Sequence, residues 1–281
     1  MLDRSVVWNY VYVVGPLAVL SATILSVISS AIWSRNVGET SCAWRTAYSP
    51  DGRAFGIWGI IYVGTFTVAL VQLTDVVGVF DWGVSLMWGL AWTCCALWVP
   101  LFDAESPGAL LAAMVAILAG AGFATLGVWM SQMWMLEPGA SADQRIQQVA
   151  LGCPLTLLAG WLATASSINV GIAWMANDVD ATQTCVKVPP RRPDESEGDY
   201  RNRRRVIYRE AYASAPMQTS VVPLFLAAAL AVLAVIIRDP LFPLPLAWAV
   251  LNLRSFPSCV GLVSLLVCAC GVAGAAMRIF A

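Results

Sequence analysis

Long apolar runs separated by short charged segments dominate the first 176 residues of the chain. Five such runs contain no Asp, Glu, Lys or Arg, and they cover residues 9–33, 54–74, 82–102, 107–135 and 149–175. A transmembrane helix needs about 20 consecutive apolar residues to cross a hydrocarbon core of about 30 Å. Each run reaches that length, so the pattern predicts five membrane-spanning helices.

The remainder of the chain has a different pattern. Residues 177–216 form the one long hydrophilic segment, and apolar runs follow at 217–237 and 257–280. Between these runs, residues 241–253 form a shorter apolar piece whose length fits a re-entrant segment as well as a thin span, and we favour a span. We therefore expect three parts, namely a five-helix transmembrane domain over 1–176, a charged linker over 177–216, and two to three further transmembrane helices within 217–281.

Composition supports the same fold class. Hydrophobic residues make up 59% of the 281 residues and charged residues only 12%, whereas soluble domains are about 25% charged. The net charge of −1 provides no overall field for a polyanion, so we expect no nucleic-acid partner. The predicted fold class is all-α, a polytopic membrane helical bundle with the lipid bilayer as its partner.

The distribution of basic residues predicts how the chain is oriented. The loops 34–53 and 177–216 lie on the same side of the predicted membrane and hold most of the Lys and Arg residues. Because cytoplasmic loops are enriched in Lys and Arg, both loops are predicted to be cytoplasmic and the N-terminus to face away. The basic run Arg201–Arg209 fits an interfacial helix on anionic lipid and a solvated linker equally well.

Several kinds of chemistry are disfavoured by the residues that are missing. The chain has no histidine, and the interiors of the predicted spans carry no acid or base. These absences exclude His-ligated zinc or haem, a His general base and a Ser-His-Asp triad, and they argue against a proton relay. The eight cysteines, most of them within spans, have no metal or redox spacing and are best explained by packing. We expect no catalytic residue and no metal site.

Aromatic residues are the abundant feature, with 13 tryptophans in the chain. Phe55, Trp58 and Tyr62 lie at i, i+3 and i+7 on one face of the second span, and Trp88 and Trp92 lie at i and i+4 in the third. Such stripes usually serve core packing. Facing stripes with few charges also suit a planar apolar ligand, so both interpretations stay open.

Polar and small residues within the spans predict contacts between helices. Asn169 needs a partner inside the membrane, either another helix or a ligand, and an interhelical hydrogen bond is the favoured interpretation. Ser26 and Ser29 can bond back to their own helix. Small residues at close spacing predict helix–helix seams, within one chain or between the two copies of a homodimer. These residues are Ala112, Ala116, Gly120 and Ala124 in the fourth span, and Gly271, Gly274, Ala275 and Ala276 near the C-terminus.

The stretch PDGRAFGIWGIIYVG, residues 50–64, resembles the second-helix signature of the TspO/translocator-protein family, also called tryptophan-rich sensory proteins. That signature has a proline before the helix, followed by Phe, Trp, Tyr and Gly. The third span is similar to the family's Trp-x-x-x-Phe from Trp98 to Phe102. The fifth span is similar to its Trp…Phe-Ala…Leu-Asn pattern at Trp161, Ala165 and Asn169. The resemblance covers residues 9–176.

Three positions depart from the family pattern. Cys95 stands where the family has an Asn before the third-span Trp, and Thr164 stands where it has the Phe of the Phe-Ala pair. The Pro-Tyr that precedes the family's fifth-span Trp is not matched, because Pro154 lies further upstream. These changes fall on the ligand side of the pattern rather than on the residues that define the fold.

The resemblance implies a TspO-like five-helix unit with an aromatic intramembrane pocket, extended by C-terminal helices. Family members bind porphyrins and other tetrapyrroles, sterols or flat aromatic drugs, which implies a transport or regulatory role without a required cofactor. Without histidine, a porphyrin would be held by stacking and burial. A small-solute transporter and a non-catalytic structural subunit are the alternatives. The implied ligand-binding residues are Phe55, Trp58, Tyr62, Trp98, Trp161, Ala165 and Asn169.

Overall fold

The computed structural model describes the five predicted spans and a few shorter stretches. The predicted spans at 217–237 and 257–280, the small-residue seam at Gly271–Ala276 and most of the charged linker lie outside the described residues. In the long helices and η1, side chains are described for 53–74, 81–104, 106–131, 150–176 and 13–33, and the backbone alone at the other helix ends. In the shorter stretches, side chains are described for all residues except 250 and 251. The described residues are 4–43, 52–74, 81–104, 106–135, 142–177, 189, 192–196, 198–200, 203, 207, 239, 241–242 and 244–251.

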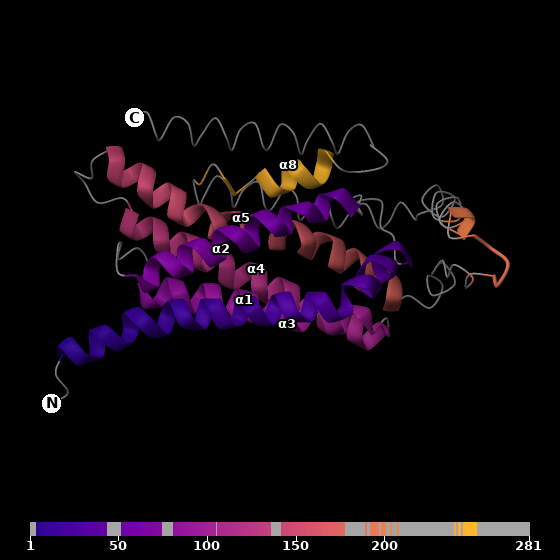
Figure 1. Ribbon diagram of the computed structural model, residues 1–281, viewed down its shortest axis with the longest axis horizontal. Helices are drawn as coiled ribbons and strands as arrows, with labels where there is room; N and C mark the ends of the chain where they lie inside the picture. The colour runs from indigo at the N-terminus through magenta and orange to yellow at the C-terminus, as the bar shows by residue number, and fades with distance from the viewer. Residues whose placement is uncertain are drawn as a thin grey trace.

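Five long helices form a bundle (Figure 1). Each contains an apolar stretch long enough to cross a membrane, which confirms the five predicted spans and the all-α fold. A short 3₁₀ helix, η1 (Gly52–Gly56), leads directly into α2, and the short helix α8 lies beside α5. The helices are α1 (Arg4–Ala43), α2 (Ile57–Leu73), α3 (Trp82–Asp103), α4 (Pro107–Met135), α5 (Ala142–Asn177) and α8 (Leu244–Leu251).

Two helix boundaries differ from the prediction. Helix α1 continues to Ala43 and so occupies much of the predicted loop 34–53, and α5 begins at Ala142, ahead of the predicted start at 149. The physical reason is that hydropathy marks only the part of a helix that lies in lipid. Backbone hydrogen bonds can extend the same helix into the aqueous region, where polar side chains cost nothing.

The short apolar piece expected at 241–253 contains a turn at Leu241–Phe242 followed by α8. Helix α8 has eight residues, and at 1.5 Å per residue it is about 12 Å long. This is less than half of a hydrocarbon core of about 30 Å. The described part of this piece is too short to cross a bilayer by itself, and because residues 252 and 253 lie outside the described residues, a span over 241–253 stays a prediction.

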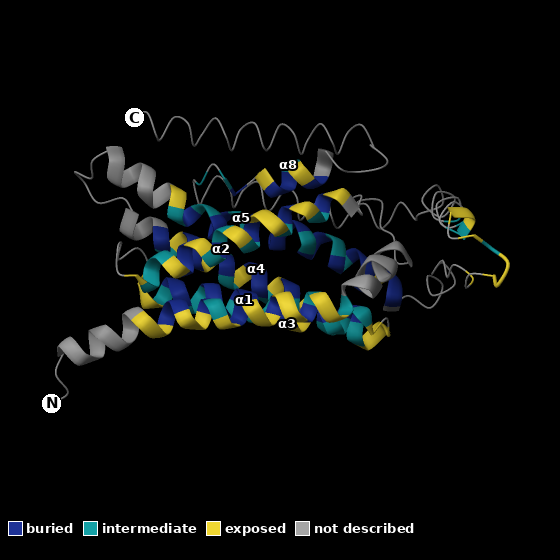
Figure 2. Ribbon diagram, in the orientation of Figure 1, coloured by how far each residue is buried: buried dark blue, intermediate teal, exposed yellow. Residues whose placement is uncertain are grey.

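The bundle core lies around α3 and α5. Helix α3 packs extensively against α1 and α4, α4 packs against α5, and α2 contacts α1 and α5. The apolar stretch of α5 is 78% buried and that of α2 only 33% buried, so residues on α5 face other helices whereas much of α2 faces outward. Figure 2 shows this contrast along the bundle.

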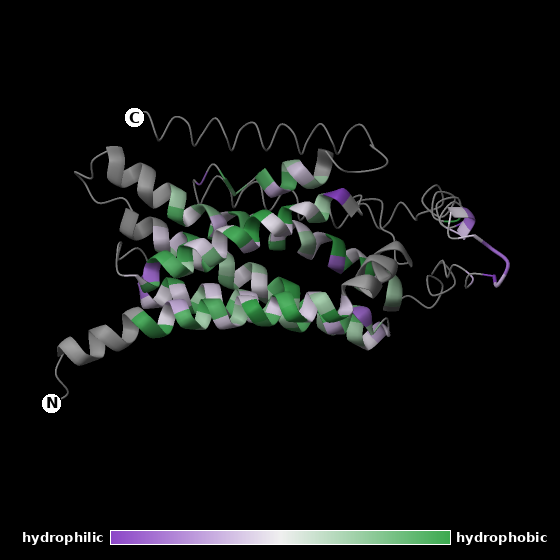
Figure 3. Ribbon diagram, viewed as in Figure 1, coloured by the Kyte–Doolittle hydropathy of each residue, from purple (hydrophilic) through white to green (hydrophobic). Residues whose placement is uncertain are grey.

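Large apolar side chains cover the outer faces of the bundle. Ile60 is 65% exposed and Val63 67% exposed on α2, and Val115 is similarly exposed on α4. Figure 3 shows hydrophobic residues along the length of the helices and hydrophilic residues mainly at their ends. Such an outer surface is unfavourable in water and favourable against lipid tails. The protein is an integral membrane protein.

Glycines permit the closest helix contacts, as predicted for the fourth span. A Cβ at Gly120 of α4 would lie 3.1 Å from the Cβ of Cys94 on α3. Ala124, one turn further along, is fully buried in the core. At Gly120 and Ala124 the predicted seam therefore joins two helices of one chain, and association of two chains through such faces stays a prediction.

Candidate aromatic site

Five aromatic rings from separate parts of the chain are in mutual contact inside the bundle, with Trp58 of α2 at their centre. The ring of Trp58 lies 5.7 Å from Tyr62 in a stacked arrangement, 6.0 Å from Trp92 of α3, and 6.1 Å from Trp161 of α5 in a T-shaped arrangement. These separations fall within the 4.5–7 Å that favours aromatic pairs. Trp58 therefore connects three helices.

Two further ring pairs complete the group. Tyr62 stacks on Trp92 with their centroids 4.8 Å apart and their planes 24° apart. Phe55, at the end of η1, meets Trp161 edge-on at 6.1 Å. We call Phe55, Trp58, Tyr62, Trp92 and Trp161 the aromatic cluster. The i, i+3, i+7 spacing places the first three rings on one face of η1 and α2, as the sequence predicts.

Trp98 and Asn169 form a second polar and aromatic group farther along α3 and α5. The indole N–H of Trp98 donates a hydrogen bond to Oδ1 of Asn169 over 2.8 Å, and Nδ2 of Asn169 donates to the carbonyl of Ala165 over 2.9 Å. The Trp98 ring packs with that of Phe102 at 5.1 Å. The expected interhelical hydrogen bond of Asn169 is confirmed.

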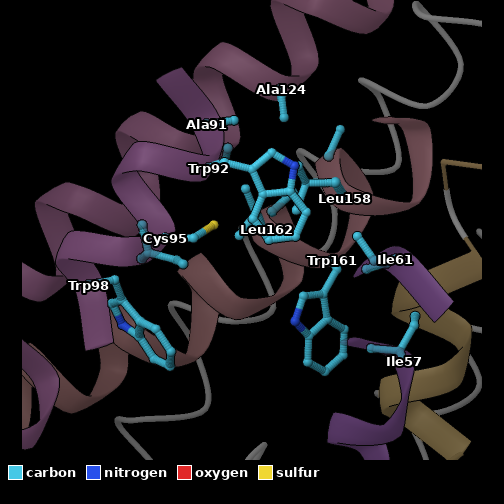
Figure 4. Packing of buried hydrophobic residues seen from close by; sticks show 14 of the residues in the cluster. Ile57, Ile61, Ala91, Trp92, Cys95, Trp98, Ala124, Leu158, Trp161 and Leu162 are labelled. Atoms are coloured by element: carbon cyan, nitrogen blue, oxygen red, sulfur yellow. The ribbon is translucent and has the colours of Figure 1, made fainter. Parts of the chain in front are cut away.

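The seven candidate residues thus fall into two neighbouring groups between α3 and α5. Phe55, Trp58, Tyr62 and Trp161 belong to the aromatic cluster, whereas Trp98, Ala165 and Asn169 form the hydrogen-bonded group. Figure 4 shows Cys95 between Trp92 and Trp98 along α3, and this thiol is 2% exposed. A cysteine in place of the family's asparagine makes this part of the site less polar, because a thiol is a weak hydrogen-bond donor.

Trp92 was missing from the candidate residues although its ring contacts both Trp58 and Tyr62. The sequence contained a signal for it, since Trp88 and Trp92 are one turn apart in the third span. That spacing alone does not show which of the two contacts the second span. Both side chains are fully buried, so the choice depends on how α3 is rotated against α2.

Helix α1 contributes to the site through a serine. The hydroxyls of Ser26 on α1 and Tyr62 on α2 lie 3.0 Å apart in a hydrogen bond, and Ser29 donates to the carbonyl of Ala96 on α3 over 2.8 Å. The expectation that these serines bond back to their own helix is therefore wrong. Both bonds link α1 to the helices that carry the aromatic rings, and a Tyr hydroxyl held in this way fixes the orientation of its ring.

Two indole N–H groups of the aromatic cluster have no hydrogen-bond partner among the described residues. They belong to Trp92, which is fully buried, and to Trp161, which is 2% exposed. In Figure 4 the indole nitrogen of Trp161 lies on the edge of its ring toward Trp98, and that of Trp92 lies toward Ala124 and Leu158. An unsatisfied buried donor costs about 1–3 kcal/mol, so these groups are unusual in a well-packed interior.

The chemistry that the site offers is that of ring faces and N–H donors. Among the described residues, no group of His, Cys, Asp and Glu side chains is arranged to hold a metal ion. The ring faces form a flat apolar surface, and the indole N–H groups of Trp92 and Trp161 have no acceptor among the described residues. The contacts that this arrangement can make are therefore ring stacking and hydrogen bonds from indole N–H groups.

A bundle of five long helices, each with an apolar stretch of membrane-spanning length, around an aromatic interior defines a polytopic α-helical membrane protein. Residues 9–186 match the family model of the TSPO-like protein. This match covers well over half of the 281 residues, so the chain belongs to the TSPO-like family, and the resemblance seen in the sequence is confirmed. The match includes all five long helices and ends before α8. No curated protein and no solved structure matches the chain.

Proposed function

We propose that this protein binds a planar, mainly apolar ligand, a tetrapyrrole such as a porphyrin or a sterol, at the aromatic cluster. The observation that carries the proposal is the meeting of five rings from η1, α2, α3 and α5 at one place inside the bundle. Rings of this kind provide flat contact area for a planar molecule at a small cost in conformational entropy.

A ligand that enters the aromatic cluster must part some of the contacts among the rings. Each aromatic pair contributes about 0.5–1.5 kcal/mol beyond its buried area, whereas micromolar binding corresponds to about 8 kcal/mol. Opening the stacked pair of Tyr62 and Trp92 therefore costs a small part of the binding free energy. Ring–ligand contacts replace the ring–ring contacts that are lost.

The unpartnered indole N–H groups indicate what else the ligand carries. Trp92 and Trp161 each present a buried N–H donor without an acceptor among the described residues. A ligand with a carbonyl, carboxylate or hydroxyl oxygen would supply that acceptor and remove the free-energy cost of the unsatisfied donor. A porphyrin with carboxylate side chains or a sterol with its hydroxyl meets this requirement. A plain hydrocarbon does not, and it is expected to bind more weakly.

A transport or regulatory role follows most simply from such a site. The alternative of a small-solute transporter would use Asn169 together with the hydroxyls of α5, but the amide oxygen of Asn169 accepts from Trp98 and its amide nitrogen donates to the carbonyl of Ala165. Both groups of this amide are therefore already engaged in bonds within the bundle. The aromatic cluster offers unused donors instead, and this supports the binding of a planar ligand.

The test is a titration of the full-length protein in lipid nanodiscs with protoporphyrin IX, followed by tryptophan quenching, with a sterol as competitor. Saturable quenching is expected, and Trp58→Ala should weaken binding at least about tenfold, equivalent to 1.4 kcal/mol. Trp174→Ala is the matched control, because this α5 tryptophan is 62% exposed on the outer face. Quenching without saturation, or equal affinity in Trp58→Ala with its helical circular dichroism intact, would contradict the proposal.

A further inference from the structure

A segment outside the family match lies against the five-helix unit. This segment comprises residues 239, 241–242 and 244–251, and we call it the strap. Its apolar side chains enter the core of the bundle, with Phe242 2% exposed, Ala249 4% exposed and Leu246 9% exposed. The match to the TSPO-like family ends at residue 186. The strap is therefore an element outside the family match that covers a surface of the five-helix unit.

Hydrogen bonds attach the strap to two different elements of the bundle. A carboxylate oxygen of Asp239 accepts from the hydroxyl of Thr156 on α5 over 2.9 Å. The indole N–H of Trp248 on α8 donates to the backbone carbonyl of Ala54 in η1 over 2.9 Å. The strap thus bridges α5 and the start of α2, and Figure 1 shows α8 running beside both helices.

One attachment point, Ala54, and one packing contact of the strap, Gly160, are chain neighbours of two rings of the aromatic cluster. Ala54 precedes Phe55, and Gly160 precedes Trp161. A Cβ at Gly160 would collide with the backbone carbonyl of Phe242 and would lie 3.1 Å from Cγ of Pro245. The strap therefore rests on the backbone that carries Phe55 and Trp161, the pair that meets edge-on at 6.1 Å.

The position of the strap closes the seam between α2 and α5. At one level the two helices touch directly, since a Cβ at Gly64 would lie 2.7 Å from Cγ of Pro154. At the level of Phe55 and Trp161, the strap covers the seam. The pairs α1–α3, α3–α4 and α4–α5 pack extensively, whereas α2 makes far fewer contacts with its neighbours α1 and α5. A lateral path from the bilayer to the cluster between α2 and α5 passes the strap.

We propose that the strap is a lid that controls exchange of ligand between the bilayer and the aromatic cluster through the α2–α5 seam. This inference rests on the proposed function, because it concerns access to the same site. An apolar ligand concentrates in the membrane, so a lateral entrance is the direct route to an intramembrane site. Opening this lid breaks the bonds of Asp239 and Trp248 and withdraws Phe242 from the bundle, and it leaves the contacts among the five long helices in place.

The kinetic test uses the full-length protein in nanodiscs and the absorbance of protoporphyrin IX in stopped-flow mixing. Trp248→Phe keeps the ring and removes the donor to Ala54, and Thr156→Val removes the donor to Asp239. In each variant the association and dissociation rates should rise together by about three- to tenfold, the effect of one intramembrane hydrogen bond. The equilibrium affinity should change by less than about twofold, since a lid affects entry and exit alike.

Matched controls separate the lid from general loosening. Trp174→Phe changes an exposed tryptophan of α5, and Thr67→Val removes an exposed α2 hydroxyl that bonds only to its own helix; neither should alter the rates. Unchanged rates in both strap variants, with wild-type binding intact, overturn the lid alone. If affinity falls because the dissociation rate alone rises, the lid is also overturned, because the strap would then contact the bound ligand. A wild-type protein without saturable binding overturns the lid and the proposed function together.

Discussion

The indole N–H of Trp98 on α3 donates to the amide oxygen of Asn169 on α5 over 2.8 Å, within a buried part of the bundle. The amide nitrogen of Asn169 donates in turn to the carbonyl of Ala165. The amide of Asn169 therefore accepts a hydrogen bond from the indole N–H on α3 and donates one to a carbonyl of its own helix, α5. In a membrane interior, where water does not supply replacements, this bond holds α3 and α5 at a defined rotation.

Replacing Asn169 should destabilise the bundle. Asn169→Leu removes the acceptor and leaves the Trp98 N–H buried without a partner, which costs about 1–3 kcal/mol. Unfolding in mixed micelles of increasing SDS fraction measures the loss. A double-mutant cycle with Trp98→Phe should give a coupling of about 0.5–2 kcal/mol, and strictly additive effects would show that the bond does not contribute to stability.

Gly160 should tolerate no larger residue, in contrast to Gly59. A Cβ at Gly160 collides with the Phe242 carbonyl, whereas a Cβ at Gly59 has nothing within 4 Å. Gly160→Ala is expected to destabilise the protein by about 1–3 kcal/mol through overpacking. Gly59→Ala should leave stability unchanged or raise it by up to about 1 kcal/mol, because alanine favours the helix. Thermal unfolding of both variants in one detergent makes the comparison, and equal effects would contradict the close contact.

The two parts of the Tyr62 side chain should have separable effects. Tyr62→Phe removes the hydroxyl that bonds to Ser26 and keeps the ring that stacks on Trp92. Stability should fall by about 1 kcal/mol or less, because the Ser26 hydroxyl can turn to a carbonyl of its own helix. Porphyrin affinity, measured by quenching, should stay within about twofold in this variant, since the stacking surface is unchanged.

Tyr62→Leu is the matched change that removes the ring as well. It removes the ring face on which a planar ligand stacks once the pair of Tyr62 and Trp92 opens, so affinity should fall by about two- to tenfold, the effect of one aromatic contact of about 0.5–1.5 kcal/mol. If Tyr62→Phe and Tyr62→Leu weaken binding equally, the hydroxyl rather than the ring contacts the ligand.

In the charged linker, the ion pair of Glu195 and Arg203 should give a local pH dependence. Arg203 donates to both carboxylate oxygens of Glu195, at 2.8 and 2.7 Å, and these bonds lower the pKa of Glu195 from 4.5 to about 2. A folded-state pKa below the unfolded value adds local stability that is fully present above about pH 4.5 and is lost as the pH falls toward 2.

Carbon-13 NMR of glutamate-labelled protein measures this titration. In Arg203→Gln the pKa of Glu195 should return toward its ordinary value, and high salt should shift the wild-type value in the same direction because the pair is in the aqueous linker. A Glu195 that titrates identically in wild type and Arg203→Gln would contradict the pairing.

The candidate site was only partly predictable. Helical spacing placed Phe55, Trp58 and Tyr62 on one face, and the need of a buried amide for a partner predicted the inward position of Asn169. The contribution of Trp92 was missed, because choosing between it and Trp88 requires the rotation of α3 relative to α2. No local pattern specifies that rotation when every face of a helix is apolar.

Sequence alone was sufficient to determine that lipid surrounds this chain, that five helices cross it, and that the family's aromatic signature is present. Length, hydropathy and residue spacing are local properties, and a bilayer imposes them on each helix separately. Only the tertiary structure decided that Ser26 bonds to Tyr62 rather than to its own helix, and that the strap rests on Gly160 beside Trp161. Those contacts join segments that are far apart in the sequence. In lipid, helices associate through close packing and hydrogen bonds rather than through hydrophobicity, so the hydropathy pattern does not specify which residues meet.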